Sequence, residues 1–234
     1  MRALELPSAR RVEPEWLDTL PADDARAIRS RRDLARVNAL MANAGIVVRE
    51  LRAGLAPRAA SIAEIGSGDG AFALRVARRL REHAGSITLL DRASAPGDAC
   101  LAAFRDAGWS PAPAAADVFE WLRDPATPRF DAIFANLFLH HFERASLAEL
   151  LRLAAAKTRL FVACEPRRSR TALAGSRLLG LAGCNDVTRH DAVVSVRAGF
   201  NGKEISELWS APGEWHLEEG RRSLFSHGFA AERA

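Results

Sequence analysis

The stretch "IAEIGSGDGAF", residues 62–72, constrains the fold more than any other part of the chain. Three glycines, Gly66, Gly68 and Gly70, join an apolar run to an amphipathic one. Glycine permits positive φ and lets the backbone approach another group closely. A buried strand that turns into a helix through such a loop is typical of α/β domains, where the loop lies at a ligand site. The sequence therefore predicts a strand–loop–helix unit that binds a ligand.

Strand-like and helix-like segments alternate along the rest of the chain. We expect strands at 61–65, 86–91, 112–117, 130–139 and 158–166, and helices at 71–83, 98–107, 144–156, 171–181 and 201–209. Residues 214–220 and 221–233 can pair as a closing antiparallel hairpin, whereas 183–200 have no clear pattern. Repeated strand–helix units predict an α/β fold with a doubly wound, mostly parallel, seven-stranded sheet and helices on both faces.

The N-terminal part has a helical pattern from about residue 14 to residue 55. Leu34, Val37 and Met41 recur at helical spacing, and Ser30 followed by Asp33 has the form of a capping box. We interpret residues 1–58 as an N-terminal helical extension that acts as a lid, and residues 59–234 as one compact binding domain.

Composition excludes several classes of function. The 234 residues suffice for one sizeable core, and 48% of them are hydrophobic and 26% charged, as in globular domains. The net charge of +4 comes from interleaved bases and acids, so we expect no nucleic-acid partner. Three cysteines without a CxxC motif indicate neither a disulfide framework nor a metal site. Without a signal peptide or a membrane span, we expect a cytoplasmic protein.

The glycine loop by itself fits two cofactors, a dinucleotide or S-adenosylmethionine. Read as G-x-G-x-x-A, it matches the dinucleotide fingerprint. However, a helical segment precedes the first strand, and Asp69 would lie next to a pyrophosphate. Asp91 ends the second expected strand, where a carboxylate can accept hydrogen bonds from ribose hydroxyls, and Asp117 ends the third, where it can accept from an adenine amino group. These positions favour the adenosyl cofactor.

The segment from Glu64 to Gly70, Asp91, Asp117 and "FDAIFANLFLHHF" resemble the ordered motifs of the class I, Rossmann-like, S-adenosylmethionine-dependent methyltransferases. "SRRDLARVN" and "NDVTRHDAVVSVRAGF" are similar to small-molecule methyltransferases of bacterial secondary metabolism. The resemblance implies S-adenosylmethionine as cofactor and S-adenosylhomocysteine as product. The cofactor-binding residues that it implies are Glu64, Gly66, Ser67, Gly68, Asp69 and Gly70 in the loop, Asp91 and Arg92 at the ribose, Asp117 and Val118 at the adenine, and Asn136 and Leu137 near the methionine portion.

Polar residues after the fourth and fifth strands are candidates for the chemistry. A phenolic acceptor has a pKa near ~10, so a base that titrates near neutrality would help to ionise it, and histidine suits that role. His140 and His141 follow the fourth strand and are the predicted catalytic residues. The candidate substrate-binding residues are Glu165 and Arg167 at the end of the fifth strand, and Arg189 and His190 in "TRHD".

The sequence thus predicts methyl transfer to a small aromatic, phenolic-lipid or polyketide-like acceptor, with O-methylation by a histidine base as the leading reaction. N- or C-methylation of a small metabolite remains open. So do an RNA or protein methyltransferase, a nicotinamide-dependent oxidoreductase and a cofactor-binding scaffold without activity. The absence of tyrosine disfavours the oxidoreductase, and "ANLF" in place of an NPPY-like motif disfavours methylation of base amino groups. The expected partners are the small-molecule acceptor and, as one option, a second copy in a homodimer.

Overall fold

The computed structural model describes residues 6–21 and 23–234, and its centre is a seven-stranded sheet of order β3-β2-β1-β4-β5-β7-β6. The strands are β1 (Ser61–Ile65), β2 (Ser86–Asp91), β3 (Ser110–Ala115), β4 (Phe130–Asn136), β5 (Thr158–Pro166), β6 (Trp215–Arg221) and β7 (Ser226–Arg233). The first five pair in parallel, and β7 pairs antiparallel with both β5 and β6. The predicted doubly wound sheet with its C-terminal hairpin is confirmed.

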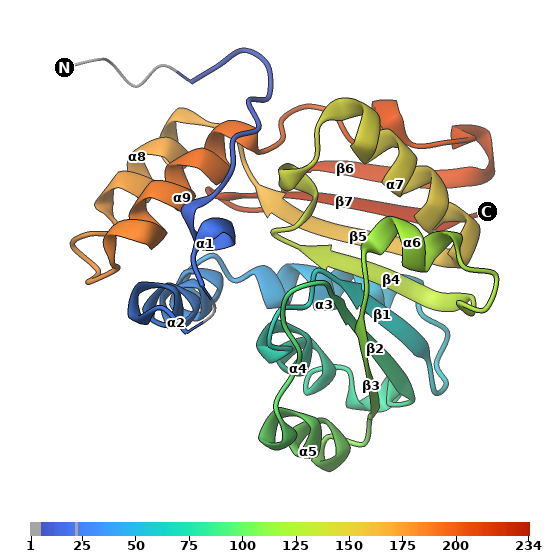
Figure 1. Ribbon diagram of the computed structural model, residues 1–234. Helices are drawn as coiled ribbons and strands as arrows, with labels where there is room; N and C mark the ends of the chain where they lie inside the picture. The colour runs from blue at the N-terminus through green and yellow to red at the C-terminus, as the bar shows by residue number, and fades with distance from the viewer. Residues whose placement is uncertain (1–5, 22) are drawn as a thin grey trace.

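Helices cover both faces of the sheet, and a further group extends beyond the carboxyl ends of the parallel strands (Figure 1). One face carries α3 (Asn43–Gly54), α4 (Ala71–Ala77) and α5 (Asp98–Asp106), and the other carries α6 (Val118–Arg123) and α7 (Arg144–Lys157). The group at the strand ends consists of α1 (Trp16–Thr19), α2 (Ala25–Leu40), α8 (Arg170–Leu178) and α9 (Asp186–Ala198). These four helices therefore lie where the fold places a ligand.

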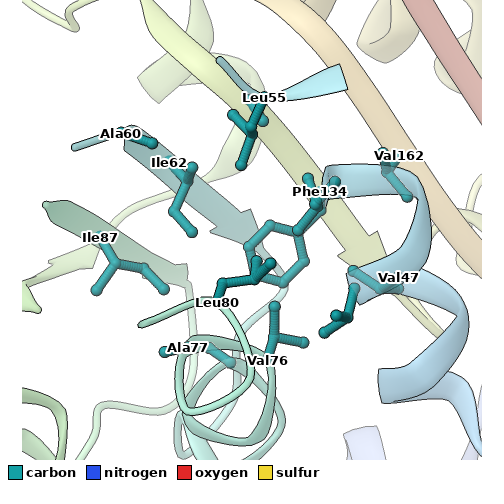
Figure 2. Packing of buried hydrophobic residues seen from close by; sticks show 14 of the residues in the cluster. Val47, Leu55, Ala60, Ile62, Val76, Ala77, Leu80, Ile87, Phe134 and Val162 are labelled. Carbon is teal, nitrogen blue, oxygen red and sulfur yellow. The ribbon is translucent and has the colours of Figure 1, made fainter. Parts of the chain in front are cut away.

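The core is divided by the sheet into two apolar layers. Phe134 of β4 packs with Ile62, Leu80 and Val47 in the layer under α3 and α4 (Figure 2). Its neighbour Ile133 points to the opposite layer, under α6 and α7, because successive side chains of a strand alternate between faces. Burial on both faces explains why these strands are almost continuously apolar in sequence.

Several element boundaries differ from the sequence prediction. The helix expected at 71–83 ends at Ala77 and is followed by a 3-10 turn, Arg81–His83, and the helix expected at 201–209 is reduced to a 3-10 turn, Ser206–Leu208. Helix α6 was missed because it is only 6 residues long, too short for a periodic pattern to show. The undecided region 183–200 contains α9.

The predicted capping box at Ser30 and Asp33 is wrong. Helix α2 begins earlier, with Asp24 as its N-cap accepting from the Arg26 N–H. Ser30 and Asp33 are buried in mid-helix, where both lie within hydrogen-bond distance of the Thr188 hydroxyl of α9. The pair is therefore a contact between helices and not a helix start.

The N-terminal segment is more closely integrated with the sheet than an added lid would be. Helix α3 contributes Val47 and Leu51 to the core, whereas α1 and α2 pack against α9. The boundary after residue 58 stays a prediction, and residues 1–5 and 22 of the proposed extension lie outside the described part. Within the described ranges, no helix is long and apolar enough to cross a membrane.

Candidate functional site

The glycine loop follows β1 at the carboxyl edge of the sheet. Gly66, Gly68 and Gly70 have φ angles of 74°, 55° and 77°, which side chains with a Cβ rarely adopt. A Cβ at Gly66 would collide with the Phe138 ring, whereas the space above Gly68 is open to 4 Å. Beyond their φ angles, Gly66 allows the close approach of Phe138, Gly68 leaves a bare backbone facing open space, and Gly70 lies close to Pro96 and Cys100.

Two polar side-chain atoms near this loop are buried without a hydrogen-bond partner. Glu64 is 1% exposed, and its Oε2 atom has no hydrogen-bond partner. Burial raises the pKa of Glu64 well above its ordinary value, and the charges of Asp69 and Asp91 add to the rise. The Ser67 hydroxyl is likewise unpaired. A buried polar group left unpaired costs about 1–3 kcal/mol, so both atoms fit a site that a polar ligand completes.

The predicted ribose and adenine carboxylates lie at the ends of β2 and β3. The Asp91 carboxylate accepts N–H groups from Gly68, at 2.9 Å, and from Ala93 and Ser94, so it joins the two loops. Asp117 caps α6 by accepting from the Phe119 and Glu120 N–H groups through Oδ1. Each carboxylate is half-buried and retains lone pairs that can accept from a ligand.

The remaining predicted cofactor residues differ in how open they are. Asp69 and Arg92 are exposed, and Val118 is buried at the start of α6. Leu137 has φ 52°, a strained conformation for a residue with a Cβ, directly after β4. The strain turns the chain back over the glycine loop, where Phe138 lies against Gly66.

Asn136 has its amide committed to the N-terminal helices. Its Oδ1 atom accepts from Asn43 at 3.0 Å, and its Nδ2 atom donates to Asn38 at 3.0 Å. Ser226 donates to Asn43 in turn. The amide therefore ties the end of β4 to α2 and α3 and does not lie open beside the glycine loop.

His140 is buried between two carboxylates. Its Nδ1 atom lies 2.8 Å from Glu165 Oε2, and its Nε2 atom lies 3.4 Å from Glu15 Oε1. Burial by itself would lower the pKa of His140, but hydrogen bonds to Glu15 and Glu165 outweigh it and raise the pKa to about 9. His140 is therefore protonated at neutral pH and has no free ring nitrogen.

Glu165 is the anchor of the loop that carries both histidines. It is fully buried and accepts the backbone N–H groups of Phe138, Leu139 and His140 in addition to the His140 ring. Burial opposes its charge, but the His140 partner and these N–H groups hold the pKa of Glu165 below its usual value. Its carboxylate is thus used for contacts within the protein, and the predicted substrate contact of Glu165 stays a prediction.

His141 is the open member of the pair. Its side chain is 30% exposed, its ring centroid lies 4.3 Å from that of His140, and its Nδ1 atom lies 3.8 Å from Asp18 Oδ2. Burial lowers the pKa of His141, and the neighbouring His140 charge lowers it further. His141 is therefore neutral at pH 7 and can accept a proton.

The "TRHD" segment lies in α9 and holds α1 in place. The Asp191 carboxylate accepts the backbone N–H groups of Trp16 at 2.8 Å and Leu17 at 3.0 Å. The His190 ring stacks on Trp16 at 3.8 Å between centroids and lies 2.9 Å from Asp191. Arg189 is exposed, and Arg167 lies half-buried after β5. The structure therefore brings His190 against Trp16 of the N-terminal segment.

Three residues that sequence reasoning missed come from the N-terminal segment. Glu15 contacts His140 and Ser195, Asp18 faces His141, and Arg10 donates to the carbonyl oxygens of His140 and Phe142. None of them belongs to a motif, and no spacing in the sequence connects them with residues 140–142. Only the folded chain brings them to the histidine loop.

Comparison with known proteins supplies a family for the central part of the chain. Residues 62–159 match the family model described as "Methyltransferase domain". This range runs from β1 into β5 and includes the glycine loop, Asp91, Asp117 and both histidines. No protein with a curated description matches the sequence.

Solved structures of methyltransferases share the fold. The plantazolicin methyltransferase BpumL, solved with SAH, has a TM-score of 0.61 at 10% identity, with 91% of this chain and 92% of that one covered. An O-methyltransferase family protein from Burkholderia thailandensis has a TM-score of 0.62 at 18% identity. The alignment covers 91% of this chain and 61% of that one, so this chain spans about three fifths of that protein.

A third such structure is the magnesium protoporphyrin IX methyltransferase ChlM from Synechocystis, with a TM-score of 0.57, 11% identity and coverage of 91% and 96%. At these identities, the likeness to all three structures concerns the fold. The family match covers the glycine loop, the two aspartates and both histidines, whereas Glu15, Asp18 and Glu165 lie outside it. The chain therefore contains a methyltransferase domain over residues 62–159, in a fold that it shares with solved methyltransferases.

Proposed function

We propose that the protein transfers a methyl group from S-adenosylmethionine to a hydroxyl oxygen of a small aromatic, phenolic-lipid or polyketide-like acceptor, with His141 as the base. The observation that carries the proposal is the unequal pair at the end of β4. His140 is charged and enclosed, whereas His141 beside it is neutral and partly open. Neighbouring groups of the same type whose surroundings shift their pKa values in opposite directions are typical of a site for proton transfer.

The described residues fit the cofactor. S-adenosylmethionine supplies a methyl group on a positively charged sulfur, which an acceptor atom displaces in line. The glycine loop offers backbone to the methionine part, and Asp91 offers a carboxylate to ribose hydroxyls. The unpaired Glu64 and Ser67 atoms are suited to the polar end of the same ligand. The negative Asp69 favours a cationic ligand over a pyrophosphate.

The histidine pair would ionise the acceptor. Only ~0.1% of a phenol is ionised at pH 7, which corresponds to about 4 kcal/mol at ~1.36 kcal/mol per pKa unit. His141 would take the hydroxyl proton, since its lowered pKa leaves the ring neutral. Asp18 would stabilise the charged His141 that forms.

Glu15, the N-cap of α1, and Asp18 within α1 reach this site, so the position of α1 decides whether the histidine pair is complete. We infer that α1 and α2 form the acceptor side of the site, and that Asp191 and His190 act by holding α1. The substrate contacts predicted for Arg167 and Arg189 stay predictions. The name of the Burkholderia structure supports transfer to oxygen, and N- or C-methylation of a small metabolite is the alternative.

A transfer assay tests the proposal. The protein is incubated with S-adenosylmethionine labelled at its methyl group and with a panel of small phenols, carboxylic acids and amines. We expect label on a phenolic hydroxyl and a large loss of transfer in His141→Ala. Transfer to amines or carbon alone would replace O-methylation by the alternative. Undiminished transfer in His141→Ala would show that His141 is not the base.

A further inference from the structure

The turn between α8 and α9 is apolar and yet exposed. Residues 178–183 read "LLGLAG", and Leu178 and Leu181 are 59% and 88% exposed. A run of exposed apolar residues is uncommon on a globular surface unless it contacts something. A turn of this kind would ordinarily be polar. The sequence of this turn therefore indicates a contact that the isolated chain does not satisfy.

This turn lies at an outer end of the molecule, beside the N-terminal part of α2 (Figure 1). Two contacts fix it there: Arg29 donates to the Gly183 carbonyl at 3.1 Å, and Asn185 donates to the Arg26 carbonyl at 2.8 Å. The backbone around the leucines is thus held by α2, while their side chains stay uncovered. The turn therefore projects from α8 and α9 and is held in place by α2.

Arginine side chains surround the apolar turn. Arg177 and Arg189 are exposed, Arg189 lies against Gly180, and neither forms an ion pair with the described residues. Both also line a groove of about 350 Å³ with Trp16 and Val193. Asp186 lines the same groove, and the nearby Asp24 and Asp33 are paired with Arg26 and Arg36. Exposed leucines bordered by unpaired guanidinium groups call for a partner that is both apolar and anionic.

We propose that the α8–α9 turn docks on the surface of an anionic lipid bilayer. Leu178 and Leu181 would enter the boundary between headgroups and acyl chains, and Arg177, Arg189 and Arg29 would contact lipid phosphates. Long arginine stems allow the charged ends to remain in the headgroup layer while the leucines go deeper. This contact is peripheral, and it goes beyond the methyl transfer and does not depend on it.

Vesicle sedimentation of the full chain tests the proposal. We expect binding to vesicles of mixed phosphatidylcholine and phosphatidylglycerol, weaker binding at high salt, and little binding to phosphatidylcholine alone. The double variant Leu178→Ser/Leu181→Ser should bind at least roughly tenfold more weakly. The variant Arg177→Gln/Arg189→Gln should lose binding and most of the salt dependence.

Two controls test whether binding depends on this surface or only on exposed apolar side chains and positive charge anywhere on the protein. Leu224→Ser removes another exposed leucine, from the β6–β7 turn, and Arg81→Gln/Arg105→Gln removes two exposed arginines beside the other end of the sheet. Both should bind vesicles as the unmodified protein does. Circular dichroism spectra must match for all variants, so that a loss of binding is not a loss of folding.

Three results would overturn the proposal. One is no binding to the anionic vesicles. Another is that Leu178→Ser/Leu181→Ser binds the vesicles as tightly as the unmodified protein does. Binding would then depend on charge alone, as binding to a nucleic acid would. The third is a dimer in sedimentation velocity that this variant abolishes, without vesicle binding, which would make the turn an interface between two copies of the chain.

Discussion

The Nδ1 atom of His140 lies 2.8 Å from Oε2 of Glu165, and both side chains are closed off from solvent. This contact joins the end of β5 to the loop after β4, because Glu165 also accepts three backbone N–H groups of that loop. It keeps a positive charge fixed beside His141. Stability, the shape of the loop and the protonation of the neighbouring histidine thus depend on one buried pair.

Glu165→Gln should change how stability depends on pH. The pKa of His140 rises from 6.5 to about 9 on folding, so its contribution is complete below pH ~6.5 and is lost as pH rises through ~9. At ~1.36 kcal/mol per unit, the free energy of unfolding should fall by on the order of 3 kcal/mol across that window. The variant should be less stable at neutral pH and show a much flatter fall.

Urea unfolding at several pH values measures this effect. Glu149→Gln, which removes an exposed partner of Arg152, serves as control and should unfold as the unmodified protein does. The lowered pKa of Glu165 adds a contribution that is present above its unfolded pKa and is lost as pH falls through its folded pKa. Equal slopes above neutral pH in Glu165→Gln and the unmodified protein would show that the pair is not charged.

The two histidines should respond differently to replacement. His141→Ala should bind S-adenosylhomocysteine normally but lose turnover by roughly 10²–10⁴-fold at neutral pH, the usual contribution of general acid–base catalysis. The defect should shrink at higher pH, because the acceptor then ionises unaided. His140→Ala should mainly lose stability, because Glu165 and Glu15 lose the positive charge that lies between them. If both variants keep near-full turnover, alignment alone drives the reaction.

Asp91→Ala should weaken cofactor binding. Removing a charged acceptor of ribose hydrogen bonds costs about 1.5–3 kcal/mol, so the dissociation constant for S-adenosylhomocysteine should rise roughly 10- to 100-fold. Asp91 also accepts three backbone N–H groups, so Asp91→Asn provides a milder change at the same place. Asp98→Ala, on the exposed start of α5, is the control. Unchanged affinity in a folded Asp91→Ala would exclude Asp91 as the ribose ligand.

Calorimetry should distinguish the cofactors. S-adenosylhomocysteine should bind with micromolar affinity and raise the melting temperature, since a ligand of the native state stabilises it by mass action. NAD and NADP should produce neither heat nor a shift. Binding of NAD without binding of S-adenosylhomocysteine would contradict the proposed cofactor.

Asp191→Ala should loosen α1. The N–H groups of Trp16 and Leu17 lose their carboxylate acceptor, and α1 has no buried residue of its own to retain it. Hydrogen exchange of residues 15–20 should become faster, while β1–β5 stay protected. Asp186 lies in the exposed first turn of α9, the helix that also contains Asp191, and Asp186→Ala should leave the hydrogen exchange of α1 unchanged. Equal protection of α1 in both variants would show that other contacts hold it.

The sheet and the glycine loop could be predicted from the sequence because their signals are local. β1 and β5 have the predicted bounds, since each is an apolar run that ends at turn or polar residues. The positive φ angles at Gly66, Gly68 and Gly70 follow from the residue type. Helix α6 and the start of α2 were missed, since a helix of two turns has little periodicity and Asp24 was not recognised as the cap.

The arrangement around the histidines depends on contacts between distant parts of the chain. Glu15 contacts His140 from 125 residues away in the sequence, and Asp18, in the short helix that Glu15 caps, lies near His141. The sequence shows two adjacent histidines and gives no reason to prefer either one as the base. Tertiary packing makes them unequal. Two carboxylates stabilise the charge on His140 against the effect of burial, whereas burial and the neighbouring His140 charge both disfavour a charge on His141. A residue's protonation depends on its surroundings in space, and those exist only after the chain has folded.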